Sequence, residues 1–281
     1  MAGLMIVLAH PDDEVLGTAG SMAKAADSGR SVQLVCATRG EEGEIHKPGV
    51  SRDELAATRE AELRCSADAL GVDEVVFLGY RDSGMAGEPT NEHPHALAQA
   101  PREQVAERIV EMIRTFQPDV VVTFGPEGGY GHPDHIAIHH ATTLAFTDAG
   151  DAYRFPVAGE PWQPVKLYFV ALASSFFRLA ADLLRAEDLP PVSFTGEPFE
   201  ELGRPEHEIT TIVDVSEFVE QKQRALACHE TQLGPEMVFA RLSPEAQRRL
   251  LSRETFVRAH PLVPAGFRET DLFEGLEEPG G

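Results

Sequence analysis

Two short clusters of histidine and aspartate residues are the parts of this sequence best suited to chemistry. His10-Pro11-Asp12-Asp13-Glu14 directly follows the apolar run 4–9, and His132-Pro133-Asp134-His135 comes soon after the apolar run 120–124. Imidazole nitrogens and carboxylate oxygens together form a ligand set that suits a catalytic zinc ion. The first expectation is therefore a hydrolytic metal site.

His10, Asp13 and His135 are the expected metal ligands, with open positions left for water and substrate. His10 and Asp13 stand three residues apart at a strand end, so a tight turn lets both side chains point at one centre. Asp12, between them, is then free to accept a proton from the attacking water. His132 is placed for acid chemistry on a substrate.

His139 is an alternative metal ligand. A helix that begins at Pro133 would place His135 and His139 on one face, and such a pair can bind zinc by itself. Packing or a supporting hydrogen bond is the favoured interpretation for His139 and for His140.

Glycines are dense just before the second cluster, at positions 125, 128, 129 and 131. Such a loop allows close approach of a ligand to the backbone. Tyr130, within this loop, is a candidate catalytic residue that either donates to a developing oxyanion or stacks on its neighbours. The segment Gly17-x-x-Gly20 is a poor match to a dinucleotide fingerprint, because nearby carboxylates would repel a pyrophosphate.

Strand-like and helix-like segments alternate along the chain. Strands are expected at 4–9, 31–37, 75–78, 120–124, 166–172 and 208–213, and helices at 17–26, 51–70, 101–116, 133–146, 174–186 and 216–229. This order predicts an α/β fold with a mostly parallel sheet and helices on both faces. In such folds, ligands bind beyond the carboxyl ends of the strands, which is where both clusters fall.

One domain is expected over residues 1–281. Residues 1–150 form its metal-binding core, and residues 151–281 are a C-terminal elaboration that completes the substrate cleft. The segment 230–281 has five prolines and little periodicity, so we expect it to wrap the surface.

The composition is that of an ordinary globular protein, with 42% hydrophobic and 25% charged residues, but the formal net charge is −22. This charge argues against nucleic acids and anionic membranes as partners. Three cysteines (Cys36, Cys65 and Cys228) are too few and too scattered for a disulfide framework. The chain has no visible signal peptide, which makes the cytoplasm the expected compartment.

The pair of motifs 9–14 and 128–135 resembles the PIG-L/LmbE family of zinc-dependent N-deacetylases. The resemblance implies a Rossmann-like three-layer fold with His10, Asp13 and His135 as zinc ligands, which favours His135 over His139. It also implies Asp12 as the general base and His132 as the residue that stabilises the tetrahedral intermediate.

Within this family, the sequence is most similar to the deacetylase and the S-conjugate amidase of the mycothiol pathway. The similarity to the deacetylase implies Glu44, Arg59 and Asp82 as substrate contacts. The segment 150–168 looks more like the amidase. The run His229-Glu230-Thr231-Gln232 resembles a late motif of the family that lies near the site.

We therefore expect hydrolysis of the acetamide of a small amino sugar with zinc as cofactor, or Fe²⁺ in its place. An amidase that acts on mycothiol conjugates is the alternative, and the oligomeric state is open. A non-haem iron oxygenase uses the same type of ligand set, but those enzymes resemble all-β barrels. A non-catalytic sugar-binding module is disfavoured by the complete set His10, Asp12, Asp13, His132 and His135.

Overall fold

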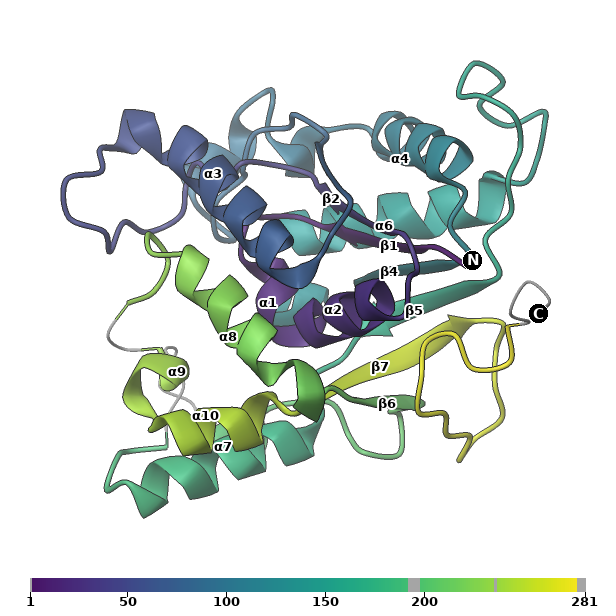
Figure 1. The fold of residues 1–281 in the computed structure, drawn as a ribbon. Helices are drawn as coiled ribbons and strands as arrows, with labels where there is room; N and C mark the ends of the chain where they lie inside the picture. The colour runs from purple at the N-terminus through teal and green to yellow at the C-terminus, as the bar shows by residue number, and fades with distance from the viewer. Residues whose placement is uncertain (1, 192–197, 235–236, 277–281) are drawn as a thin grey trace.

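A mixed β-sheet runs through the centre of the molecule (Figure 1). The computed structural model describes residues 2–191, 198–234 and 237–276, and among these residues the sheet has seven strands in the order β3-β2-β1-β4-β5-β7-β6. The strands are β1 (Leu4–Leu8), β2 (Val32–Cys36), β3 (Glu74–Phe77), β4 (Val120–Phe124), β5 (Lys166–Val170), β6 (Thr211–Asp214) and β7 (Arg253–His260). The pairs from β3 to β5 are parallel, and β7 is antiparallel to both of its neighbours. The predicted α/β fold with a mostly parallel sheet is confirmed.

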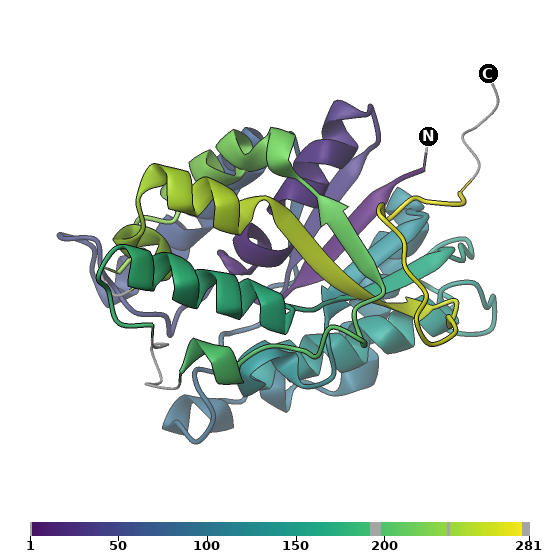
Figure 2. The ribbon, with the colours of Figure 1, turned by 90° about the horizontal axis from the view of Figure 1, so that it is seen from below.

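Helices cover both faces of the sheet (Figure 2). On one face lie α2 (Ala19–Asp27), α3 (Arg52–Leu70) and α8 (Val219–Cys228), which contact one another, and on the other lie α4 (Arg102–Phe116) and α6 (Pro133–Asp148). Every residue of β1, β2 and β4 is buried as a result. Their continuous apolar runs are typical of strands with both faces covered.

The other helices lie between these elements along the chain. They are α1 (Asp13–Gly17), α5 (Gly128–Gly131), α7 (Ser174–Ala186), α9 (Val238–Arg241) and α10 (Pro244–Leu251), with single 3₁₀ turns η1 (Pro89–Glu92), η2 (Leu97–Gln99), η3 (Phe199–Glu201) and η4 (Ser216–Phe218). The expected helix 17–26 corresponds to α2, and the short helix α1 precedes it, with Thr18 between the two.

The prediction that residues 230–281 only wrap the surface is wrong. This segment supplies α9, α10 and the strand β7, which inserts between β5 and β6. Within β7, Phe256 is fully buried, and Glu254 accepts hydrogen bonds from Lys222 and from the first turn of α2. The pattern was missed because polar residues flank the short apolar stretch of β7, and its partner strands are distant in sequence.

The expectation about cysteines also needs correction. Cys65 in α3 and Cys228 at the end of α8 form a disulfide. The two residues are 163 positions apart, and they meet because α3 and α8 pack side by side. The spacing of the cysteines in the sequence does not indicate such a pairing. Cys36 is a buried free thiol, as expected.

The order of the strands determines where a site can form. From β1 the chain proceeds to β2 and β3 on one side, and β4 then returns to the other side of β1. Loops that leave neighbouring strands in opposite directions open a crevice at their carboxyl ends. The loops after β1 and β4 carry the two histidine–aspartate clusters.

In the described part of the chain, no helix is both long and apolar enough to cross a membrane.

Candidate metal centre and active site

Three predicted ligand residues come together at the carboxyl ends of β1 and β4. His10 lies two residues beyond the end of β1, Asp13 opens α1, and His135 lies in the first turn of α6. The Nδ1 atom of His10 is 3.2 Å from Nε2 of His135, and that Nε2 is 3.2 Å from Oδ1 of Asp13. The third separation, from His10 Nδ1 to Asp13 Oδ2, is 3.4 Å.

These separations fit a divalent metal ion. Tetrahedral ligands with zinc bonds of 2.0–2.1 Å lie about 3.3 Å from one another. The nitrogens of His10 and His135 also form a metal-sized group with a nitrogen of His132. The donor set of two imidazoles and one carboxylate therefore suits a metal ion without rearrangement.

The charge around His10 also favours a cation. Burial by itself would lower the pKa of His10, but hydrogen bonds with Asp13, Asp134 and Asp82 raise the pKa well above its usual value. Burial would raise the pKa of Asp13, but His135 and His10 hold it well below the usual value. The site thus carries excess negative charge that a bound metal ion would balance.

Asp134 supports His10 from behind. Its fully buried carboxylate lies 3.1 Å from Nε2 of His10, and it accepts hydrogen bonds from the backbone and hydroxyl of Ser83. Histidine ligands to metals usually donate their second ring N–H to such a carboxylate, which fixes the ring and its tautomer. Asp134 belongs to the second predicted cluster, but the sequence alone indicated no role for it. Its position between the two histidines of the second cluster was the available signal.

His135 is fixed by the glycine-rich loop that precedes it. Its Nδ1 donates to the carbonyl of Gly128 over 3.2 Å, and its ring stacks on Phe124 with centroids 3.9 Å apart. Gly128 has φ of +63°, and a Cβ there would lie 2.7 Å from Cγ1 of Ile136. Only glycine allows the loop to come this close to α6, and Nε2 of His135 is left to face His10 and Asp13.

Asp12 lies beside these donors without sharing their direction. Its backbone has φ of +118°, and its Oδ2 is 3.0 Å from a guanidinium nitrogen of Arg59. Burial raises the pKa of Asp12 to about 6, against the opposing effect of Arg59. A carboxyl group with such a pKa is ionised at neutral pH and can accept a proton.

His132 caps the first turn of α6 through its side chain. Its Nδ1 accepts the N–H of Asp134 over 3.1 Å, so the ring proton of neutral His132 is on Nε2. Burial, together with the charges of His10 and His135, lowers the pKa of His132 to about 4. His132 is therefore a neutral hydrogen-bond donor at neutral pH.

Tyr130 lies at the rim of the site. Its side chain is 57% exposed, and its ring meets those of His132 and His135 edge-on at 6.1 and 5.2 Å. This position of Tyr130 is compatible with both predicted roles, which are donation to an oxyanion and ring contact with its neighbours.

The three expected substrate contacts differ in position. Arg59 is only 3% exposed and donates to the carbonyls of Pro11 and Gly40. Asp82 is also buried, with Oδ1 3.5 Å from Nε2 of His10. The structure brings both residues to the site. Glu44 is exposed and pairs with His46 over 2.9 Å.

His139 and His140 lie away from the metal donors. The Nδ1 atom of His139 donates to the carbonyl of Phe124 over 2.8 Å, and its ring packs edge-on against Phe169. His139 belongs to neither of the groups of the described residues that could hold a metal ion. Its contacts fit the packing role that the sequence analysis favoured.

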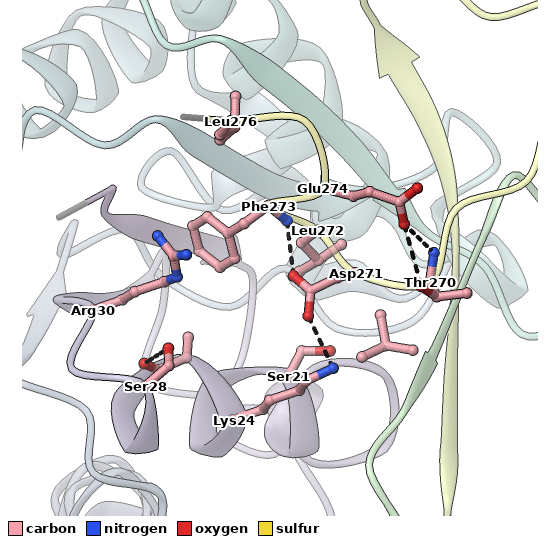
Figure 3. Close-up of a pocket in the computed structure, with 12 residues that line it drawn as sticks. Ser21, Lys24, Ser28, Arg30, Thr270, Asp271, Leu272, Phe273, Glu274 and Leu276 are labelled. Carbon is pink, nitrogen blue, oxygen red and sulfur yellow. Dashed lines mark hydrogen bonds and ion pairs between the residues drawn. The ribbon is translucent and has the colours of Figure 1, made fainter. Parts of the chain in front are cut away.

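A separate pocket of about 360 Å³ lies elsewhere (Figure 3). It is formed between α2 and the segment 270–276, which are joined by an ion pair of 2.8 Å between Lys24 and Asp271. Arg30 in its lining precedes β2, so the pocket lies at the amino ends of the strands. The metal donors lie at the opposite, carboxyl edge.

Comparisons with known proteins agree with this geometry. Residues 5–146 match the family model described as "PIG-L: GlcNAc-PI de-N-acetylase". The 1D-myo-inositol 2-acetamido-2-deoxy-alpha-D-glucopyranoside deacetylase of Rhodococcus jostii (strain RHA1) is 38% identical, over 97% of this chain and 98% of its own length.

Two solved structures share the fold. The N,N'-diacetylchitobiose deacetylase from Pyrococcus horikoshii has a TM-score of 0.64 at 21% identity, with 91% of this chain and 83% of that chain covered. The 4-carboxy-2-hydroxymuconate hydratase GalB from Pseudomonas putida has a TM-score of 0.63 at 19% identity, with 95% and 100% covered. Because a hydratase shares it, the fold alone does not determine the reaction.

Proposed function

The chain belongs to the PIG-L family, and we propose that it is a zinc-dependent N-deacetylase that removes the acetyl group from an N-acetylated amino sugar. The observation that carries this proposal is the triangle of donor atoms from His10, Asp13 and His135, with separations of 3.2 to 3.4 Å. Two nitrogens and one carboxylate oxygen with free positions are typical of a catalytic zinc site, although Fe²⁺ suits the same ligands.

The chemistry divides between the metal and the side chains around it. When bound, zinc lowers the pKa of a water molecule toward about 7 and polarises an amide carbonyl. Asp12 accepts the proton of the attacking water, and Arg59 keeps Asp12 ionised until it does so. The same proton can then pass from Asp12 to the leaving nitrogen, which departs as a free amine beside acetate.

His132 is the proposed partner of the carbonyl oxygen. As the amide carbon becomes tetrahedral, negative charge develops on this oxygen, and the Nε2–H of neutral His132 is available to donate to it. A donor that is already oriented stabilises such charge without reorganisation. Tyr130, at the rim beside His132, is proposed as a second donor to the same oxygen.

Glu44, Arg59 and Asp82 are proposed as the substrate-binding side. Glu44 is exposed in the loop after β2, and the other two residues lie beneath that loop, where Asp82 accepts the N–H of Glu42. Carboxylates that face a sugar can accept hydrogen bonds from its hydroxyl groups. The name of the Rhodococcus relative makes an inositol glycoside of N-acetylglucosamine the first substrate to test.

The test is an assay of amine release with four compounds. These are N-acetylglucosamine, its inositol glycoside, diacetylchitobiose and an S-conjugate of mycothiol, each with and without a chelator. We expect the inositol glycoside to react fastest, and we expect the chelator to abolish the reaction until zinc is restored. Cleavage of the conjugate alone would favour the amidase, and release that resists chelation would contradict a metal-dependent mechanism.

A further inference from the structure

Glu14 is fully buried next to Asp12, and both of its carboxylate oxygens accept hydrogen bonds from other residues of the protein. Its Oε2 accepts the backbone N–H of Asp12 over 2.9 Å. Its Oε1 accepts both the hydroxyl of Ser66 and the Nε2–H of His229, each over 2.6 Å. Glu14 therefore acts on the backbone of Asp12 rather than on a substrate.

The backbone of Asp12 needs such support. Its φ of +118° lies in a region that residues with a Cβ rarely adopt, and such conformations persist only where the surroundings enforce them. The hydrogen bond from the Asp12 N–H to Glu14 fixes the peptide group on the amino side of this strained residue. A shift of Glu14 would therefore move Asp12 relative to the metal donors.

The two residues that hold Glu14 are themselves joined by the disulfide. Ser66 directly follows Cys65, and His229 directly follows Cys228. The cross-link between the two cysteines thus fixes the distance between two donors that share one oxygen atom, Oε1 of Glu14. His229 is 1% exposed, and its Nδ1 has no hydrogen-bond partner in the described part of the chain. Among the described residues, Glu14 is the one hydrogen-bond partner of the His229 side chain.

A second contact nearby keeps the segment after α8 in place. Thr231 donates through its backbone N–H and its hydroxyl to the carboxylate of Glu62, over 2.9 and 2.6 Å. Glu62 lies on α3, one turn before Ser66. The position of His229 is therefore set on both sides, by the disulfide before it and by Thr231 after it.

We propose that His229 is a positioning residue for Asp12, acting through Glu14 with Ser66 as the second support. The inference rests on the proposed function, because it takes Asp12 as the base. It assigns a role in the reaction to the C-terminal half of the chain, more than two hundred residues from the base.

The experiment compares His229→Ala and His229→Gln with the wild type, and uses the exposed His207→Ala as a control. The amide of glutamine can donate from about the position of imidazole Nε2, whereas alanine cannot donate. A misplaced catalytic group can cost about 100-fold in rate. We therefore expect His229→Ala to lose about 100-fold in kcat, with KM and zinc content unchanged, and His229→Gln to recover most of the loss. Equal kcat in wild type and His229→Ala, or an equally slow His229→Gln that retains zinc, would overturn the proposal.

A crystal structure of His229→Ala gives a second readout that does not depend on activity. We expect the φ of Asp12 to leave the positive range and its hydrogen bond to Glu14 to break, and an unchanged Asp12 would overturn the proposal. If His229→Ala does not fold, Ser66→Ala removes one hydroxyl from the same Glu14 oxygen and is tested in the same two ways. A wild type that cleaves none of the acetamides would refute the proposed function, while the crystal structures would still decide on the positioning of Asp12.

Discussion

The guanidinium group of Arg59, which is almost fully buried, lies 3.0 Å from the carboxylate of Asp12. Arg59 is held there by the carbonyls of Gly40 and Pro11. Burial raises the pKa of Asp12, and Arg59 opposes this shift. This pair therefore keeps a buried carboxylate ionised beside the metal donors.

Replacement of Arg59 distinguishes its role as the counterion of Asp12 from a role in substrate binding alone. In Arg59→Met, Asp12 loses its counterion, so we expect kcat to fall by about 100-fold, at the lower end of the range that general-base catalysis contributes. A residue that only binds substrate would instead raise KM and leave kcat unchanged. Arg64→Met, on the exposed side of the same helix, is the matched control.

Replacement of Asp12 tests the base directly. Asp12→Asn keeps the shape of the side chain and removes its ability to take a proton, so kcat should fall by at least about 100-fold. Bound zinc, measured by mass spectrometry of the metal, should stay at the wild-type level because Asp12 is outside the donor triangle. A variant with near-normal kcat would exclude Asp12 as the base.

The site was predictable where its residues are close in sequence. The clusters around His10 and His135 each span a few residues after an apolar strand, so residue type and spacing were sufficient to find them. His229 and β7 are different, because they reach their places through packing between distant segments. The sequence carries the propensity of each element but only a weak signal of which distant elements will meet.

The disulfide is expected to contribute strongly to stability. It closes a loop of 163 residues, and disulfides typically stabilise proteins by about 2–4 kcal/mol. The double variant Cys65→Ala/Cys228→Ala should show a free energy of unfolding in urea that is lower by about this amount. Dithiothreitol should destabilise the wild type and leave the double variant unchanged. Equal stability of the wild type and the double variant without reductant would show that the cross-link adds nothing.

His139 should make stability depend on pH. Burial lowers the pKa of His139 below its ordinary value of 6.5. As the pH falls, the unfolded state takes up a proton at this position before the native state does, so stability decreases below about pH 6.5. His139→Gln should show a smaller loss of unfolding free energy between about pH 7.5 and 5.5. An unchanged slope in His139→Gln would refute the assignment.

The central claim is that His10, Asp13 and His135 hold one divalent metal ion, and calorimetric titration of metal-free protein with zinc tests it most directly. The account predicts one zinc ion per chain for the wild type and loss of this binding in His135→Ala, whereas His139→Ala should bind as the wild type does. A wild type that takes up no zinc, or a His135→Ala variant that binds it equally well, would contradict the account.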